Sequence, residues 1–130
     1  MKIIHKIGGN IIRNKKLLIV REEGEDMFIE PGGRPEKGET PKETLERELK
    51  EELGISINKM TFFGNFKEKF NNSFIIMDVY SVETSDEVSP QGEIEEYLWI
   101  GKDYKKQNLK IGSIIEKHIM PKLIEQGLIK

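Results

Sequence analysis

The amino-acid sequence predicts an α/β sandwich around a mixed β-sheet, and three observations support this. Extended, aliphatic segments separated by polar turns flank one strongly marked helix over residues 40–53. A second helical pattern closes the chain. With 130 residues, the chain is long enough for one packed core and too short for two, so we expect a single domain over residues 1–130.

The N-terminal part of the chain has the pattern of strands and turns. Residues 2–12 are rich in isoleucine, and a polar turn separates them from residues 17–20, whose unbroken apolar character is typical of a buried strand. We expect these two segments to pair as a hairpin. A charged loop follows at residues 22–26, and the short apolar run 27–29 stops at Pro31.

The helix over residues 40–53 has the clearest local pattern. Thr40 and Glu43 match a capping box, and Pro41 fits the first helical position. Gly54 stands where a helix usually ends in a left-handed residue. One apolar face is expected from leucines at every fourth position: Leu45, Leu49 and Leu53.

Beyond this helix the pattern becomes extended again. We expect strands over residues 61–66, 74–82 and 96–100, with a polar loop before the last of them. Residues 111–126 have helical spacing, and Pro121 is expected to bend or divide that helix.

The amino-acid composition excludes several classes of function. The formal net charge is −2, so no basic surface indicates binding to a nucleic-acid polymer. There is no cysteine, which excludes disulfides, thiolate metal ligands and a cysteine nucleophile. Charged and polar residues interrupt residues 1–20, unlike a signal peptide or a membrane span. We therefore expect a soluble, cytoplasmic protein that associates with no membrane.

Three glutamates of the central helix indicate a metal site. Glu48, Glu51 and Glu52 are spaced i, i+3 and i+4, so they lie on one helix face, where their charges repel one another. A hard cation would reverse that repulsion, and magnesium prefers carboxylate oxygens. The Pro-Gly-Gly turn ahead of the helix allows backbone to approach a ligand closely. The alternative is a solvated acidic surface, and the acidic face alone does not distinguish the two.

The stretch from Gly33 to Ile55 resembles the Nudix box at every defined position. Its pattern is Gly, five residues, Glu, seven residues, Arg-Glu-Leu, one residue, Glu-Glu, one residue, Gly-Ile. Residues 93–100 also resemble the acidic strand, ending in tryptophan, that many members contain. The resemblance implies the Nudix fold, an α/β/α sandwich with a mixed sheet in which the box forms a loop-helix-loop. It also implies hydrolysis of a nucleoside diphosphate linked to another group.

The resemblance further implies a ligand set for the metal. Glu48 and Glu52 would be the principal ligands of magnesium, for which manganese could substitute. Glu51 would complete the acidic cluster, and the backbone carbonyl of Gly32 would be a further ligand.

Other roles follow from the same resemblance. Arg47 would orient the glutamates, and Glu39 would support the loop or a metal-bound water. The general base differs among members and is either a glutamate of the box or an acid further along the chain. Glu93 and Glu96 are the downstream candidates, and a solvated acidic edge is the alternative interpretation of each.

The substrate is predicted less directly. The compact length and the acidic strand favour the mutator-type (MutT-like) group, which converts a nucleoside triphosphate, oxidised ones included, to the monophosphate and pyrophosphate. Hydrolysis of ADP-ribose, a sugar nucleotide or a dinucleoside polyphosphate is an alternative, as is a non-catalytic nucleotide-binding regulatory module. Arg21 could contact a phosphate and Phe28 could stack on a base, with surface and core positions as the alternatives. A homodimer is plausible from the family.

Overall fold

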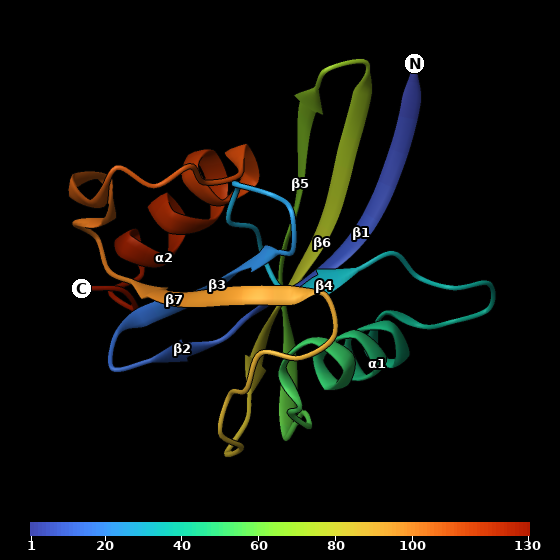
Figure 1. Ribbon diagram of the computed structural model, residues 1–130, viewed down its shortest axis with the longest axis horizontal. Helices are drawn as coiled ribbons and strands as arrows, with labels where there is room; N and C mark the ends of the chain where they lie inside the picture. Colours follow the sequence, from blue (N-terminus) through green and yellow to red (C-terminus); the bar gives the residue numbers. More distant parts are fainter.

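The computed structural model describes residues 1–130 as two β-sheets with crossing strand directions and one helix on each side (Figure 1). The first sheet is mixed, since β1 runs parallel to β6 while the other pairs are antiparallel. Its strand order is β4 (Gly32–Gly33), β1 (Lys2–Asn10), β6 (Ser73–Glu83) and β5 (Lys59–Phe70). The second sheet is antiparallel, in the order β2 (Ile12–Arg13), β3 (Lys16–Glu22) and β7 (Ile94–Ile100).

The expected hairpin between residues 2–12 and 17–20 is wrong for most of its length. β1 pairs with β6 and β4, and only the short strand β2 pairs with β3. The connecting turn holds Asn14 and Lys15 at φ 53° and 61°, the left-handed geometry that matches the twist of a tight hairpin. Such a turn determines pairing only next to itself, whereas the position of β1 is determined by burial of Ile7 in the core.

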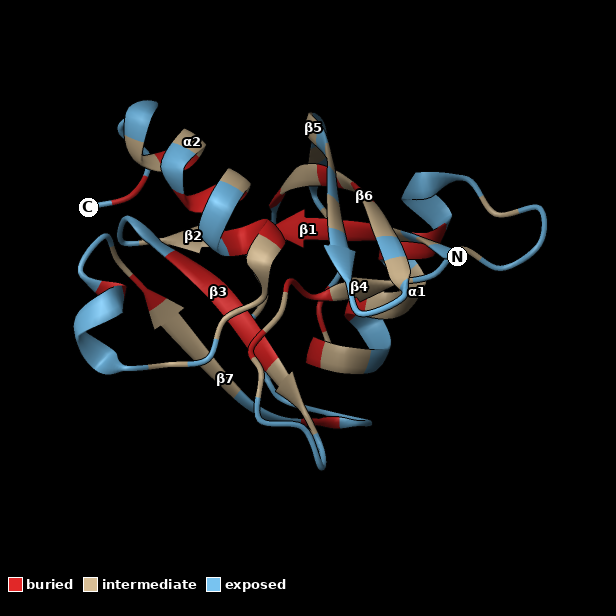
Figure 2. Ribbon diagram, turned by 90° about the horizontal axis from the view of Figure 1, so that it is seen from above, coloured by how far each residue is buried: buried red, intermediate tan, exposed pale blue.

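Strand β3 separates two core clusters, which explains its unbroken apolar sequence (Figure 2). Successive side chains of a strand point to opposite faces. Leu17 and Ile19 pack in the cluster that contains the C-terminal helix, and Leu18 and Val20 pack in the cluster that contains the central helix. The buried strand expected at residues 17–20 is therefore confirmed, with both of its faces covered.

The central helix α1 spans Pro41–Leu53 and confirms the predicted boundaries. Thr40 and Glu43 form the complete capping box, and Gly54 ends the helix at φ 68°. All three residues of the expected apolar face are fully buried: Leu45, Leu49 and Leu53. Since this face is packed against the sheets, the opposite acidic face points away from the core.

The remaining elements are longer or less regular than expected. β5, β6 and β7 extend beyond the predicted strands. A 3-10 turn, Tyr104–Gln107, precedes the C-terminal helix, which contains a π-helical turn at Ile115–Ile119 and continues as α2 (Met120–Glu125). The division falls just before Pro121, which lacks the N–H that a regular helix requires. None of the helices is long and apolar enough to span a membrane.

Candidate active site

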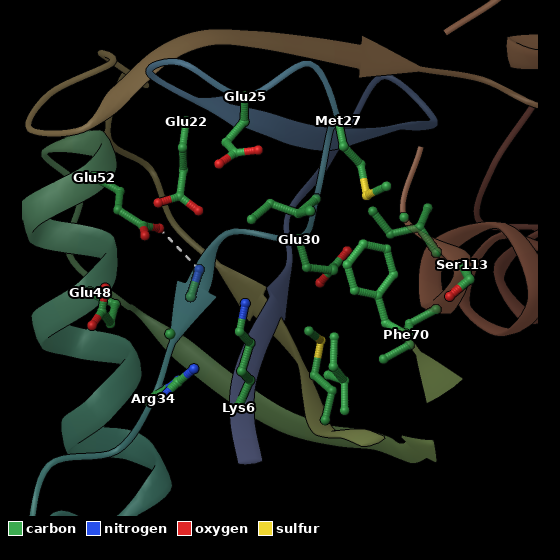
Figure 3. A pocket seen from close by; sticks show the side chains of 18 of the residues that line it. Lys6, Glu22, Glu25, Met27, Glu30, Arg34, Glu48, Glu52, Phe70 and Ser113 are labelled. Atoms are coloured by element: carbon green, nitrogen blue, oxygen red, sulfur yellow. Dashed lines mark hydrogen bonds between the residues drawn. The ribbon is translucent and has the colours of Figure 1, made fainter. Parts of the chain in front are cut away.

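A cleft of about 800 Å³ lies between α1, the mixed sheet and the segment that leads into the C-terminal helix (Figure 3). One part is acidic, where Glu48 and Glu52 project from α1. Another part is apolar and comes from the mixed sheet and the C-terminal segment. Its lining includes Phe70, Ile75, Met77 and Ile114. The cleft therefore combines a charged end with a surface suited to a flat, apolar group.

Glu52 is held against the backbone of the Pro-Gly-Gly turn. Its Oε1 accepts a hydrogen bond of 3.0 Å from the backbone N–H of Gly32, drawn as the dashed line in Figure 3. Burial raises the pKa of Glu52 to about 8, and the neighbouring carboxylates of Glu48 and Glu22 act in the same direction. Without a cation this carboxyl is therefore in an environment that disfavours its charged form.

The two glycines of the turn permit a close approach to these carboxylates. A Cβ on Gly33 would lie 2.5 Å from the Cδ atom of Glu48. Gly32 has φ +139°, and a Cβ there would lie 2.1 Å from the carbonyl oxygen of Ile7. Glycine is therefore required at Gly32 for its conformation, whereas a side chain at Gly33 would displace the carboxylate of Glu48.

Arg47 organises the loop that precedes α1. Its Nε and one terminal nitrogen donate to the two oxygens of Glu39 over 2.7 and 2.9 Å, and its other terminal nitrogen donates to Glu48 over 2.7 Å. The bonds from Arg47 lower the pKa of Glu39 to about 2. Those bonds also raise the pKa of Arg47 itself. Arg47 thus fixes the orientation of Glu48 and ties α1 to the loop by a bidentate contact.

The donor set at the acidic end fits a hard divalent cation. Glu48 and Glu52 project from the same helix into the cleft, and the negative charge of Glu48 raises the pKa of Glu52, as expected of neighbouring carboxyl groups. No group of three or more carboxylate or imidazole side chains converges at metal-ligand spacing. Magnesium commonly binds proteins through one or two carboxylates, with water or substrate oxygens completing the shell.

The remaining predicted site residues fall into two groups, those that line the cleft and those that lie outside it. Glu93 lines the cleft. Glu51 projects outward, with 60% of its side chain exposed, 3.8 Å from Arg47. Arg21 forms ion pairs with Glu95 and Glu96 over 3.0 and 3.1 Å.

Arg21 and Phe28 also contact each other, and neither lines the cleft. The guanidinium of Arg21 lies 6.0 Å from the centre of the Phe28 ring, and Phe28 is buried in the core. Phe70, by contrast, lines the cleft. A role for Arg21 or Phe28 in substrate binding stays a prediction.

Two further acidic elements of the cleft were missed from the sequence. The charged loop 22–26 contributes Glu22 and Glu25 to the rim, although it has the composition of an ordinary solvated loop. Glu30 lines the cleft from within and is only 4% exposed. Burial raises the pKa of Glu30 well above its usual value. Its position between an apolar run and Pro31 was the available clue, because a charge there is unusual for a buried segment.

Fold and cleft together define a class of protein, a small α/β enzyme whose helix presents carboxylates to a cleft. The family model of the NUDIX domain matches residues 6–115. The chain therefore belongs to the Nudix family and is one of its pyrophosphohydrolases, acting on compounds that contain a linked nucleoside diphosphate. The Nudix fold expected from the box is confirmed.

Individual relatives agree with this assignment. The chain is 29% identical to an 8-oxo-dGTP diphosphatase of Haemophilus influenzae over 125 residues, which cover 92% of this chain and 81% of that protein. It is 32% identical over 94 residues to an NAD-capped RNA hydrolase, NudC, from the same species, covering 72% of this chain but 36% of that protein. The MutT structure from Methanosarcina mazei superposes with a TM-score of 0.80 at 20% identity, covering 97% of this chain and 96% of that one, a likeness of fold alone.

Proposed function

We propose that the protein hydrolyses a nucleoside triphosphate, including oxidised forms, to the monophosphate and pyrophosphate, with magnesium as its metal. The observation that carries this proposal is the pair of carboxylates, Glu48 and Glu52, that faces an apolar pocket across one cleft. A triphosphate has a matching arrangement, with its phosphate chain at one end and its base at the other. The similarity to an 8-oxo-dGTP diphosphatase over most of both chains supports the same substrate class.

The proposed metal ligands are Glu48 and Glu52, with Glu51 nearby and a backbone carbonyl from Gly32. Bound there, a divalent metal would polarise the phosphoryl oxygens and lower the pKa of an attacking water. The protein contributes mainly positioning, which is what phosphoryl transfer requires most. Arg47 keeps Glu48 oriented through a 2.7 Å bond, and Gly33 leaves space for the carboxylate.

Among the downstream acids, we propose Glu93 as the general base. Glu93 lines the cleft, whereas Glu96 is paired with Arg21. A general base must lie within hydrogen-bond reach of the water that it deprotonates. Glu93→Gln should therefore lower kcat strongly, while Glu96→Gln should retain most of the activity. A larger loss in Glu96→Gln than in Glu93→Gln would contradict this assignment.

The experiment that tests the proposed function is hydrolysis of a nucleotide panel with magnesium and then with manganese. The panel contains dGTP, 8-oxo-dGTP, dATP, ADP-ribose, a UDP-sugar, NAD and a dinucleoside polyphosphate. We expect a triphosphate to be turned over fastest, with release of pyrophosphate and without release of phosphate. Glu52→Gln serves as the control for activity from contaminating enzymes.

Three results would contradict the proposed substrate. Faster cleavage of NAD or of ADP-ribose into two monophosphates would identify a dinucleotide or a nucleoside diphosphate sugar as the substrate instead. Release of phosphate from the triphosphate would indicate attack at the terminal phosphorus. Binding of a nucleotide without turnover in either metal would favour a regulatory module.

A further inference from the structure

Lys6 is a cation of the cleft that the proposed hydrolysis does not use. It lies on β1, is half-buried, and lines the cleft together with nine acidic residues. Even so, Lys6 takes part in no ion pair, so no carboxylate oxygen lies within 4.0 Å of its Nζ. A half-buried ammonium without a carboxylate partner is available to an anionic group that enters the cleft.

Apolar neighbours support the side chain of Lys6. In the register of β1 and β6, Lys6 lies opposite Met77, and both Ile75 and Met77 line the cleft. Lysine commonly lays its aliphatic stem along such a surface and leaves its amino group in the open space beyond. In Figure 3 this amino group is drawn between the glutamates of α1 on one side and Phe70 on the other.

The strand order of the mixed sheet explains this intermediate position. β4, where Gly32 donates to Glu52, is the neighbour of β1 on one side. On the other side follow β6 with Met77 and then the strand β5, which ends at Phe70. Lys6 therefore stands between the acidic end and the apolar part of the cleft. A nucleotide has the same order, because the phosphate attached to the sugar lies between the outer phosphates and the base.

We propose that Lys6 binds the α-phosphate of the nucleotide, the one attached to the sugar, and retains it in the monophosphate product. Its ammonium offers three donors to phosphate oxygens. Arg34, another cleft cation without an ion pair, follows Gly33 at the acidic end and is placed for the outer phosphates, which leave as pyrophosphate. This inference rests on the proposed function, since it names the residue that holds one part of the same substrate.

The test measures binding of the product, which requires no turnover. Dissociation constants of dGMP, dAMP, dCMP and dTMP are measured by calorimetry at a fixed magnesium concentration, for the parent and for Lys6→Met. Methionine keeps an unbranched stem and removes the charge. The monophosphate that the parent binds best should bind roughly 10- to 100-fold more weakly to Lys6→Met, as expected for loss of a hydrogen bond between charged groups.

Three comparisons separate a phosphate contact from a general effect. Lys6→Arg keeps the charge and should retain most of the affinity. The matching nucleoside, which lacks the phosphate, should bind the parent and Lys6→Met equally. Lys110→Met removes the same charge from the same cleft, but Lys110 is 59% exposed and already paired with Asp26 over 3.3 Å. Its loss should change the affinity much less.

Each remaining outcome would overturn the inference. An unchanged affinity in folded Lys6→Met would exclude the phosphate contact, and equal losses in Lys6→Met and Lys110→Met would leave only the general charge of the cleft. A parallel loss of nucleoside binding would assign Lys6 to the base or to the fold. Absence of monophosphate binding to the parent would also overturn it. If Lys6→Met does not fold, Lys6→Gln provides the same comparison. Failure of triphosphate hydrolysis would overturn only the proposed function, because these affinities do not depend on catalysis.

Discussion

Two clusters of glutamates each surround one arginine, and their environments differ. In the first, Arg47 contacts Glu39 and Glu48, whose side chains are 16% and 17% exposed. In the second, Arg21 contacts Glu95 and Glu96, whose side chains are 50% and 47% exposed. The first cluster belongs to the cleft helix, and the second lies along β3 and β7.

The difference shows that acidic residues form a candidate site when they are largely buried and held in position by the surrounding structure. The number of acidic residues in a cluster does not decide this. Around Arg47 the helix is fixed to the core by leucines, and backbone glycines approach the carboxylates. Around Arg21 the glutamates are solvated, and exposed ion pairs contribute little to stability. Substitutions in both clusters can therefore test the comparison directly.

The largest effect is expected from Glu52→Gln. The substitution removes a proposed ligand but keeps its shape, so turnover should fall by roughly 100-fold or more, since even supporting groups around a metal contribute about that much. In the parent, added magnesium should also raise Tm, because a ligand that binds only the folded state stabilises it. Near-normal turnover, or an equal rise of Tm in the variant, would exclude the proposed metal role.

Leu49→Ala should affect stability rather than chemistry. Leu49 is 0% exposed and packs in the cluster under α1. Its truncation should lower the free energy of unfolding by about 2–5 kcal/mol, because a cavity would remain. Denaturant unfolding followed by circular dichroism measures this. A midpoint equal to that of the parent would show that the acidic face lacks the rigid support described above.

Arg47→Lys should reduce turnover by roughly 10- to 100-fold while leaving the chain folded. Lysine keeps the charge but cannot make the paired bonds to Glu39 together with the bond to Glu48. Arg21→Lys is the matched control from the exposed cluster and should change turnover much less. Equal losses in the two variants would remove the distinction between the clusters.

Glu39 should make stability depend on pH in the acid range. Its pKa is lowered from 4.5 to about 2 in the folded protein, so its ionised form stabilises the fold above pH 4.5. This contribution is lost as the pH falls through about 2. As the pH is lowered over this range, the melting temperature of the parent should therefore fall more steeply than that of Glu39→Gln. Parallel curves for the two proteins would contradict the strong Arg47–Glu39 contact.

The smallest effect is expected from Glu95→Gln. Its side chain is 50% exposed and shares Arg21 with Glu96, so the change in unfolding free energy should be about 0–1 kcal/mol. Turnover should stay close to that of the parent. A loss comparable to that in Arg47→Lys would show that the exposed cluster takes part in the site after all.

Local sequence patterns were sufficient to predict those parts of the fold that depend on interactions between residues close together in the chain. The capping box at Thr40, the leucine face of α1 and the end of the helix at Gly54 depend on residues within a few positions of one another, so the sequence predicts them. The partner of β1 depends on a strand about 70 residues away and was predicted wrongly. The local sequence favours a hairpin, but β1 pairs with β6 instead, and this pairing accompanies burial of Ile7 in the core.

The sequence by itself determined the family, the α/β fold and the helix that presents Glu48 and Glu52, because the box spacing and the 3.6-residue period encode them. Only the tertiary structure decided that Glu93 faces the cleft while Glu96 pairs with Arg21, and that Glu30 meets Asn10. Those relations join residues far apart in the chain. Packing of the two sheets and their helices, rather than local propensity, brings such residues together.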